Sequence, residues 1–330
     1  MTRKVLLDVK DLETTFFTDD GAVPAVDHIS FNIKEGEILG IVGESGCGKS
    51  VTSLSIMGLV PSPPGKITNG EIILDGQNIL DFNEKQMRSV RGKDIAMIFQ
   101  EPMTSLNPLF TIGNQLVEAI RIHNRTWSKK QAQERAIEIM KLVGLPRAEQ
   151  LLKDYPHQLS GGMRQRVMIA MALVCDPKVL IADEPTTALD VTIQAQILKL
   201  MKELNARLNT SILLITHDLG VVAETCERVI VMYAGQVVEE APVKEIFQNP
   251  QHPYTQGLIK SVPDMRFKKD SLYSIPGNVP KPGSIKQGCR FAPRCEFATD
   301  ACTKSVPKLY QTSDYHKTRC ILVDRGQHDE

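Results

Sequence analysis

The chain has 330 residues, with 39 Lys or Arg and 39 Asp or Glu, so its formal net charge is zero. This length suits one large domain plus an appendage, and a neutral chain has no overall field that attracts nucleic acid or anionic lipid. The longest apolar run, 167–175, covers nine residues, whereas a membrane-spanning helix needs about 20. The apolar stretch near the N-terminus is too short for a signal peptide. We therefore expect a cytosolic protein without a membrane span.

The first segments of the chain are predicted to be β-strands. Residues 29–33 alternate between apolar and polar side chains, as in a half-buried strand, and residues 71–74 are followed by an Asp-Gly turn. Between them, residues 38–42 form an apolar run without alternation, which suits a strand buried on both faces of a parallel sheet. A helix should start at Gly48 and stop before Pro61.

The loop after strand 38–42 carries a P-loop motif. Residues 43–50 read Gly-Glu-Ser-Gly-Cys-Gly-Lys-Ser, and the strand–loop–helix context is the one that this motif requires. Its glycines let backbone N–H groups surround phosphate, and the helix dipole adds attraction. We expect Lys49 to reach the β- and γ-phosphates and Ser50 to ligate Mg²⁺. The residues expected at the nucleotide are Gly43, Ser45, Gly46, Cys47, Gly48, Lys49, Ser50 and Val51.

A P-loop alone does not distinguish a kinase, a GTPase and an ATPase. Cys47 stands where any small residue would fit, and a redox role is the less favoured alternative for it.

Residues 102–160 are predicted to form a helical insert. Ser128 and Gln131 give a capping-box pattern, and the apolar residues that follow recur on one helical face. After the insert, strands at 179–182 and 212–215 alternate with an amphipathic helix. This alternation indicates a doubly wound α/β sheet, and residues 228–238 are predicted to close it with a hairpin.

Two acids end the strand at 179–182. Asp183 suits the Mg²⁺ shell, and Glu184 can polarise a water for in-line attack on the γ-phosphate. An ordinary pair of acids at a strand end is the alternative. The P-loop in the same chain argues against it.

Residues 159–166 read Leu-Ser-Gly-Gly-Met-Arg-Gln-Arg and resemble the signature sequence of ABC ATPases. Ser160 is a strong N-cap, Gly161 and Gly162 permit close backbone approach, and the helix that follows offers free N–H groups to an anion. In the family, this helix end contacts the γ-phosphate of ATP held by the opposite subunit. Met163 stands where the family usually has Gln.

The resemblance extends over residues 5–240 in the family's order. Gln100 matches the Q-loop, which ligates Mg²⁺ and senses the transporter partner. Residues 188–190 match the D-loop at the subunit contact, with Asp190 as its acid, and His217 matches the switch histidine that contacts the γ-phosphate. Phe16 is favoured as the aromatic residue that stacks on adenine, with Phe17 as the alternative.

Four cysteines crowd into the last part of the chain, where prolines and glycines interrupt any long periodic pattern from about residue 242. Five, six and seventeen residues separate Cys289, Cys295, Cys302 and Cys320 in turn. Four thiolates can hold tetrahedral zinc or an iron–sulfur cluster. Zinc knuckles favour shorter spacings, so the larger cluster is favoured.

This part of the chain also resembles the C-terminal region of dipeptide and oligopeptide importer ATPases, at residues 249–255 and 288–295. Some members of that family bind a [4Fe–4S] cluster here. We therefore rank a [4Fe–4S] cluster first, zinc second and unligated thiols third. A structural staple is favoured over electron transfer.

The expected fold is an α/β P-loop NTPase core of the ABC ATPase type, with an antiparallel β subdomain and a helical subdomain. A small Cys-rich C-terminal domain completes it, so the domains are 1–241 and 242–330. The resemblance implies a peripheral ATPase at the cytoplasmic face of the plasma membrane. It would power import of dipeptides or oligopeptides through a separate permease, with an extracellular peptide-binding protein acting indirectly.

Two such ATPase subunits, identical or sister chains, would pair head to tail and use ATP and Mg²⁺. Nickel or another small cargo is an alternative. A rival of another class is a soluble ABC ATPase that acts on ribosomes or nucleic acid. The neutral charge, the single cassette and the tail argue against this rival, and a kinase would leave residues 160–162 without a role.

Overall fold

The computed structural model describes residues 3–19, 21–100, 105–187, 189–262 and 273–325. The chain divides into two compact units, each assembled from segments that are separated in the sequence. The first unit takes its described residues from 1–7, 33–37 and 78–214, and the second takes them from 8–32, 38–77 and 215–330.

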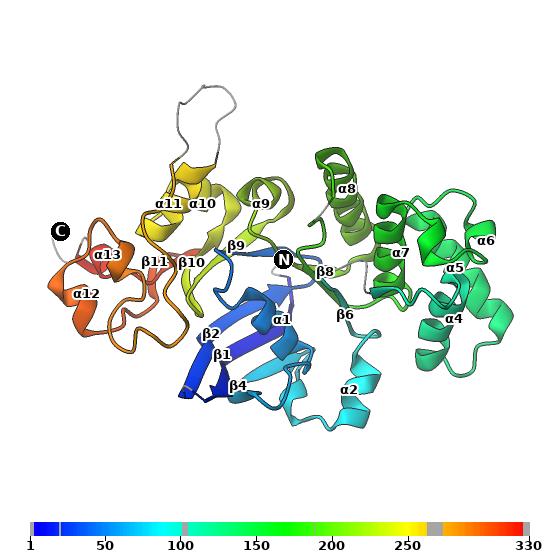
Figure 1. The fold of residues 1–330 in the computed structure, drawn as a ribbon, viewed down its shortest axis with the longest axis horizontal. Coiled ribbons are helices and arrows are strands. Elements are labelled where there is room, and N and C mark those ends of the chain that lie inside the picture. Colours follow the sequence, from blue (N-terminus) through cyan, green and yellow to red (C-terminus); the bar gives the residue numbers. More distant parts are fainter. Residues whose placement is uncertain (1–2, 20, 101–104, 188, 263–272, 326–330) are drawn as a thin grey trace. The chain divides into compact units, whose positions relative to one another are not determined.

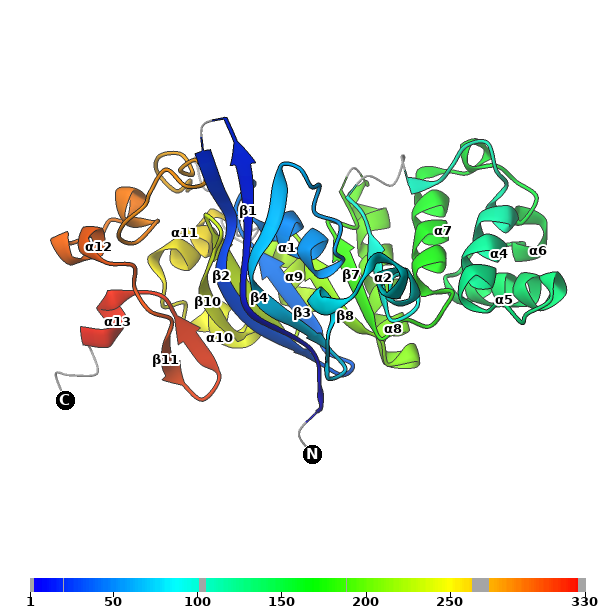
Figure 2. The ribbon, with the colours of Figure 1, turned by 90° about the horizontal axis from the view of Figure 1, so that it is seen from below.

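A four-stranded sheet with the order β2-β1-β4-β5 lies largely in the second unit (Figure 2). Its strands are β1 (Val5–Thr18), β2 (Gly21–Lys34), β4 (Gly65–Leu74) and β5 (Gln77–Asn78). In β2, Ile29, Phe31 and Ile33 are buried between more exposed neighbours, which confirms the predicted alternation. After β4, Asp75 and Gly76 turn the chain with φ values of 47° and 86°, a backbone shape that Asp-Gly pairs favour.

Five further strands of the second unit follow one another in the order β11-β12-β10-β9-β3. They are β3 (Ile38–Val42), β9 (Arg228–Tyr233), β10 (Gln236–Pro242), β11 (Tyr310–Ser313) and β12 (His316–Thr318). Every residue of β3 is buried, and β3 runs parallel to β9, as the apolar run predicted. The predicted hairpin joins β9 to β10 through Ala234 and Gly235, whose φ values are 46° and 86°.

The helices of the second unit include several that belong to the C-terminal part of the chain (Figure 1). They are α1 (Lys49–Ile56), α9 (Leu219–Thr225), α10 (Val243–Gln248), α11 (Pro253–Ser261), α12 (Asp300–Lys304) and α13 (Ile321–Arg325), with a 3₁₀ turn η3 (Ala292–Arg294). α1 ends before Pro61, as predicted.

An aromatic cluster joins the tail to the sheet of the second unit. The ring of Tyr233 on β9 lies 4.6 Å from Tyr254 and 5.2 Å from Phe291, measured between centroids. Tyr254 and Phe291 both follow Pro242, and both are buried. The tail therefore shares a hydrophobic core with the strands that carry the P-loop.

The first unit combines a short sheet with a group of helices. Its strands follow the order β8-β7-β6, with β6 (Ile95–Ile98), β7 (Val179–Asp183) and β8 (Ser211–Ile215). β6 and β7 are parallel, and all residues of β7 and β8 are buried. These strands confirm the predictions for 179–182 and 212–215.

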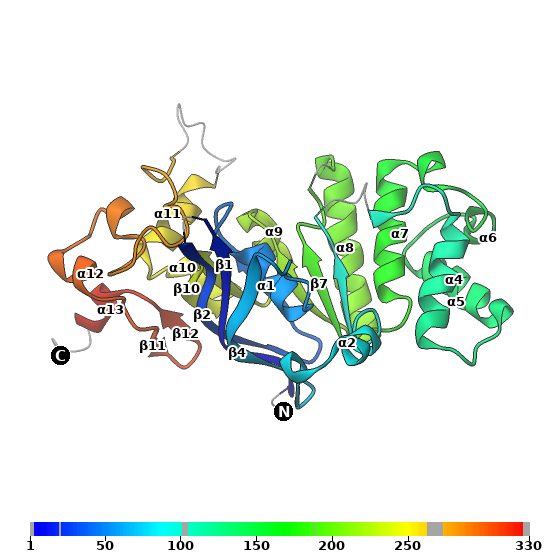
Figure 3. The ribbon, with the colours of Figure 1, turned by 60° about the horizontal axis from the view of Figure 1, so that its bottom comes forward.

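The helical insert is also present in the first unit, where Figure 3 shows α4, α5 and α6 gathered beside α7. The helices of this unit are α2 (Glu84–Val90), α4 (Ile112–His123), α5 (Lys129–Leu142), α6 (Ala148–Leu151), α7 (Gly161–Leu173) and α8 (Val191–Leu208), with 3₁₀ turns η1 (Ile79–Asp81) and η2 (Pro156–Gln158). The predicted capping box of Ser128 and Gln131 starts α5. Residues 102–104, where the insert was predicted to begin, lie outside the described part of the chain.

Within the described residues, no helix combines the length and apolar character needed to cross a bilayer.

Candidate active site

The P-loop connects β3 to α1 in close contact with neighbouring backbone. A Cβ at Gly43 would stand 2.2 Å from the carbonyl oxygen of Met232, and a Cβ at Gly48 would stand 2.4 Å from that of Ala25. Both glycines also have positive φ values, 154° and 102°. Only glycine satisfies both demands, so Gly43 and Gly48 are explained by the packing of the loop itself.

Lys49 lies inside the curve of this loop. Its side chain is nearly buried, and Nζ donates hydrogen bonds to the carbonyl oxygens of Gly43 (2.7 Å) and Glu44 (3.0 Å). The ammonium group is therefore held where the loop backbone surrounds it. A fixed cation in this position suits the binding of phosphate.

The start of α1 is arranged to accept an anion. Its N-cap, Gly48, has left-handed backbone and makes no side-chain capping hydrogen bond. The first N–H groups of a helix have no partner within the helix, and the helix dipole favours negative charge at this end. Ser50 and Val51 belong to this first turn and are partly exposed.

Cys47 is fully buried in the P-loop, 3.7 Å from Lys49 Nζ. Burial raises the pKa of its thiol, which disfavours the reactive thiolate. The structure therefore supports the interpretation of Cys47 as a small packed side chain.

Two of the predicted residues, Gln100 and Glu184, are in contact just after the carboxyl end of β7. Asp183 is the last residue of β7 and is buried. Glu184 follows with a φ of 47°, and its Oε2 accepts hydrogen bonds from Gln100 Nε2 and Thr187 Oγ1, both 3.0 Å long. Left-handed backbone at a non-glycine residue costs about 1–3 kcal/mol and is concentrated at functional sites. The sequence analysis did not single out Thr187.

The signature residues begin α7. Ser160 is its N-cap, and its Oγ accepts a hydrogen bond from the N–H of Met163 (3.3 Å), as predicted. Gln165 on the same helix donates to the carbonyl oxygen of Pro185. This hydrogen bond fastens α7 to the turn that follows Glu184, and the sequence analysis missed it.

The two signature glycines have different surroundings. Apart from its chain neighbours and the backbone of its own helix, no described residue has an atom within 4 Å of the position that a Cβ on Gly161 would take. At Gly162, a Cβ would lie 3.2 Å from Ile193 on α8. Packing within the described subunit therefore explains Gly162 but not Gly161.

Asp190 is the N-cap of α8, and its Oδ1 accepts a hydrogen bond from the N–H of Ile193 (2.9 Å). Ala188, at the start of the predicted D-loop match, lies outside the described residues. His217 follows β8 and is exposed, and Asp218 next to it caps α9.

The two candidate adenine-stacking residues differ in exposure. Phe16 is partly buried, and its Cε1 lies 3.0 Å from the position of a Cβ on Gly65, whereas Phe17 is 53% exposed. Stacking on Phe16 stays a prediction, and Phe17 presents the more accessible ring.

All four tail cysteines line one pocket. Burial raises the pKa of the Cys320 thiol to about 11, and the charges of the other three thiols act in the same direction. In the described part of the chain, however, no group of three or more His, Cys, Asp or Glu side chains is placed to hold a metal ion.

Two tail residues contact the P-loop directly, and the sequence analysis assigned a role to neither. The hydroxyl of Tyr254 accepts a hydrogen bond from the N–H of Glu44 (2.9 Å), and Arg294 forms an ion pair with the Glu44 carboxylate. Both residues lie in the stretches 249–255 and 288–295 that carry the resemblance to importer ATPases. An arginine between two cysteines was the available signal.

Comparisons with known proteins agree with these features. A family model described as "ABC transporter" matches residues 26–187, and one described as "Oligopeptide/dipeptide transporter, C-terminal region" matches residues 238–302. The chain is 56% identical to the oligopeptide transport ATP-binding protein AppD of Bacillus subtilis, over 97% of each chain. The chain belongs to the ABC transporter family. It is an ABC-type ATPase, and its relatives include ATP-binding proteins named for oligopeptide and dipeptide transport.

Two further matches bear on the whole chain and on the cassette. The oligopeptide transport ATP-binding protein OppD of Bacillus subtilis is 51% identical over 96% of this chain and 89% of its own length. Among solved structures, the dimeric, post-hydrolysis ATP-binding cassette MJ0796 bound to ADP and Pi is 32% identical. Its TM-score is 0.64, with 72% of this chain and 98% of that chain covered. The fold is therefore that of an ABC ATPase cassette.

Proposed function

We propose that this ABC ATPase powers the import of dipeptides or oligopeptides through a separate membrane permease. The observation that carries the proposal is likeness along nearly the whole chain, including the tail, to proteins named for oligopeptide and dipeptide transport. In this proposal the subunit is peripheral, at the cytoplasmic face of the membrane. An extracellular binding protein delivers the cargo, which the ATPase never contacts.

In the proposed site, the P-loop and the start of α1 hold the triphosphate. Backbone N–H groups from Ser45 to Val51 face the phosphates, and Lys49 supplies a positive charge at the β- and γ-phosphates. His217 contacts the γ-phosphate, and Phe16 stacks on adenine, with Phe17 as the alternative.

Mg²⁺ would be held by the hydroxyl of Ser50, the carboxylate of Asp183 and the side-chain oxygen of Gln100. The fit is chemical, since Mg²⁺ prefers oxygen ligands and is commonly held by one or two carboxylates together with substrate phosphates. Bound there, the ion would neutralise charge on the phosphates.

Glu184 is the proposed general base that orients the attacking water. Its hydrogen bonds from Gln100 and Thr187 fix the carboxylate, and its strained backbone is consistent with a functional position. The link between Gln100 and Glu184 gives a route by which a partner that moves the Q-loop also moves the base.

We further propose that the site is completed by a second ATPase subunit. Ser160, Gly161 and Gly162 would contact the γ-phosphate on the partner's P-loop, and Asp190 would lie at the subunit contact. The open surroundings of Gly161 support this, because close approach by another molecule explains a glycine that the described subunit does not require. ATP would close the pair and hydrolysis would reopen it.

The tail, residues 242–330, is proposed as a domain with a four-cysteine centre. Four thiols line one pocket, and four thiolates are the donor set that a [4Fe–4S] cluster requires. A single zinc ion requires all its sulfur ligands to lie about 2.3 Å from one point. A cluster is larger than a single ion, so its sulfur ligands can lie farther apart. The proposed role is a structural staple, with zinc as the second choice. Protein purified without oxygen should contain iron and sulfide. Stoichiometric zinc without iron would show that the site binds zinc and not a cluster.

Glu184→Gln tests the catalytic proposal. We expect turnover of ATP to fall about 10²–10⁴-fold, the range typical of a lost general base, while the ATP-bound dimer becomes long-lived. Glu203→Gln is the matched control, because Glu203 is an exposed acid on α8 that pairs only weakly with Lys199 (4.0 Å). Unimpaired hydrolysis by Glu184→Gln would remove Glu184 from this role.

The cargo is tested with the subunit and its permease in vesicles. ATP-dependent uptake of labelled dipeptides or oligopeptides, abolished by Glu184→Gln, is the expected result. Uptake of nickel and not of peptide would show that the proposed cargo is wrong and favour the nickel alternative. Stable association with ribosomes or nucleic acid instead of a permease would overturn the transport proposal.

A further inference from the structure

The segment 288–295, which we call the arginine segment, connects the tail to the P-loop. Its sequence is Gly-Cys-Arg-Phe-Ala-Pro-Arg-Cys, and its two cysteines line the thiol pocket. The side chains of its two arginines, Arg290 and Arg294, are only 11% and 5% exposed. Arginine is rarely buried unless it is paired, so the partners of these side chains show what the segment holds.

Arg294 grips the side chain of a P-loop residue. Its Nη1 and Nη2 donate to the two carboxylate oxygens of Glu44, at 2.7 and 3.1 Å. The rest of the guanidinium is fixed by the carbonyl oxygens of Ile275 (3.3 Å) and Pro276 (2.9 Å). A two-pronged pair of this kind fixes orientation as well as charge.

The same P-loop residue is also held through its backbone. The N–H of Glu44 donates to the hydroxyl of Tyr254, and the Tyr254 ring is buried against Tyr233. Arg294 Nη1 also donates to the Tyr233 hydroxyl (3.3 Å). Both ends of Glu44 are therefore positioned by residues of the tail and by β9.

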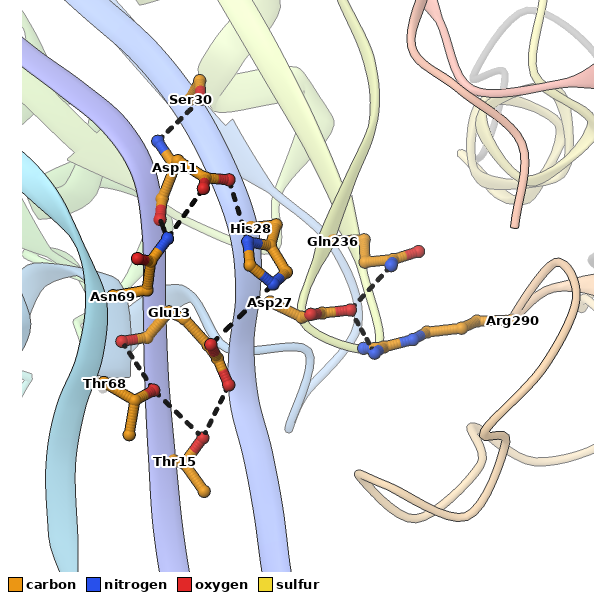
Figure 4. A network of polar contacts seen from close by, with 10 residues as sticks. All are labelled: Asp11, Glu13, Thr15, Asp27, His28, Ser30, Thr68, Asn69, Gln236 and Arg290. Atoms are coloured by element: carbon orange, nitrogen blue, oxygen red, sulfur yellow. Dashed lines mark hydrogen bonds and ion pairs between the residues drawn. The ribbon is translucent and has the colours of Figure 1, made fainter. Parts of the chain in front are cut away.

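Arg290 contacts a turn that lies against the P-loop. Figure 4 shows its contact with the carboxylate of Asp27, and it also donates to the carbonyl oxygen of Ala234. Gly235, next in the chain, donates its N–H to the carbonyl oxygen of Cys47 (2.9 Å). Gln236 adds a hydrogen bond to the same Asp27 oxygen that Arg290 contacts (2.7 Å). The turn that contacts the P-loop at Cys47 is thus tied to the arginine segment.

The charge of Glu44 explains why this support matters for ATP. A carboxylate in a loop that binds a triphosphate repels the negatively charged ligand. The Arg294 guanidinium neutralises that carboxylate and holds both of its oxygens, while the Glu44 side chain stays 30% exposed. A loop held in its binding shape also loses less conformational entropy when the ligand arrives.

We propose that Arg294 is a positioning residue of the nucleotide site, which acts through Glu44 to shape the P-loop and to cancel its negative charge. Arg290 positions the turn at residues 234–235, which contacts the P-loop at Cys47. This inference rests on the proposed nucleotide site. It makes the tail part of the ATP-binding apparatus.

The test measures the affinity of full-length protein for a non-hydrolysable ATP analogue, for ADP and for AMP, each with Mg²⁺. Arg294→Gln should weaken binding of the ATP analogue about 10–100-fold, that of ADP less and that of AMP least, because repulsion by Glu44 grows with ligand charge. Arg294→Lys, which keeps the charge and loses the fork, should fall between Arg294→Gln and the unmodified protein.

The decisive comparison is rescue. Adding Glu44→Gln to Arg294→Gln should restore most of the affinity, because the uncompensated carboxylate is then gone. Arg319→Gln is the matched control, since Arg319 is a partly buried tail arginine that donates to the carbonyl oxygens of Val237 (2.8 Å) and Pro307 (3.1 Å). It should change the thermal midpoint without changing the ranking of the three nucleotides.

Several outcomes would overturn the proposal. These are an Arg294→Gln affinity equal to that of Arg319→Gln, an equal loss for all three nucleotides, or a double variant no better than the single one. If Arg294→Gln does not fold, Arg294→Lys with and without Glu44→Gln carries the same comparison. Lys49→Ala distinguishes failure of the proposed nucleotide site from failure of the role of Arg294. If Lys49→Ala binds ATP normally, the proposed nucleotide site is wrong. If Lys49→Ala loses ATP binding and Arg294→Gln does not, only the role of Arg294 is wrong.

Discussion

Two helices of this ABC ATPase start with glycine-rich sequence, yet their first turns are built in opposite ways. α1 starts behind Gly48, which has left-handed backbone, makes no side-chain cap and leaves no room for a Cβ. α7 starts behind Ser160, which caps the helix with its own hydroxyl, and Gly161 has open surroundings among the described atoms. The first helix start is shaped by its own subunit. The second is capped by its own side chain, and its open glycine fits the proposed approach of a second subunit's nucleotide.

This difference teaches which half of the site is preorganised. The P-loop is fixed by neighbouring backbone, by Tyr254 and by Arg294, so it is ready for phosphate before any partner arrives. Among the described atoms, the signature turn leaves space at Gly161, where we propose that the nucleotide of a second subunit approaches. Substitutions of the glycines at the two helix starts should therefore affect different steps.

The largest effect is expected for Gly48→Ala. The left-handed backbone alone costs a non-glycine residue about 1–3 kcal/mol, which corresponds to roughly 5- to 150-fold in affinity, and the contact with the Ala25 carbonyl oxygen adds to it. Titration calorimetry of the isolated subunit with an ATP analogue measures the loss. Gly46→Ala, which shares the positive φ but has nothing within 4 Å, should lose less. Equal affinity for Gly48→Ala and the unmodified protein would contradict this account of α1.

An intermediate effect, on a different step, is expected for Gly161→Ala. ATP affinity and thermal midpoint of the isolated subunit should not fall, because the described atoms leave room for the methyl group. Hydrolysis should drop about 10-fold or more, equivalent to about 1.4 kcal/mol in the barrier, because the partner's phosphate approaches the helix less closely. Steady-state turnover and binding are compared on the same preparation. A loss of affinity in the isolated subunit would show that Gly161 serves its own subunit.

The smallest effect is expected for Ser160→Ala in the subunit without nucleotide. Losing an N-cap costs about 1 kcal/mol, whereas Ser160→Gly should cost only a few tenths. Differential scanning calorimetry of both variants checks this order. An unchanged midpoint for Ser160→Ala would mean that the hydrogen bond to the Met163 N–H does not support α7.

Much of the fold was predictable because the signals were local. The apolar run at 38–42, the capping box of Ser128 and Gln131, and the turn at Ala234 and Gly235 each specify backbone shape over a few residues. β11 and β12 were missed, since Tyr-Gln-Thr-Ser and His-Lys-Thr carry no apolar alternation. Their strand conformation comes from pairing with each other and, for β12, with β10, which is tertiary context.

In the site, too, residues with a local sequence signal were predicted and long-range contacts were not. The motif residues were found because chemistry dictates their type and spacing, and the structure confirms Ser160 as an N-cap that accepts a hydrogen bond from the Met163 N–H. The contacts of Glu184 with Thr187, of Gln165 with Pro185 and of Glu44 with Arg294 were not found. The last two join residues 20 and 250 positions apart, and no local pattern reports such a pairing.

The separation of Glu44 and Arg294 has a consequence for biosynthesis. Arg294 is made 250 residues after Glu44, so at about 5–20 residues per second a ribosome needs roughly 12–50 s between the two. During that interval the emerging cassette carries an acidic phosphate loop whose counter-charge does not yet exist. A polypeptide released early would lack the arginine entirely. If Arg294 has the proposed role, such truncated chains would bind ATP less tightly and would compete poorly with full-length subunits for the permease.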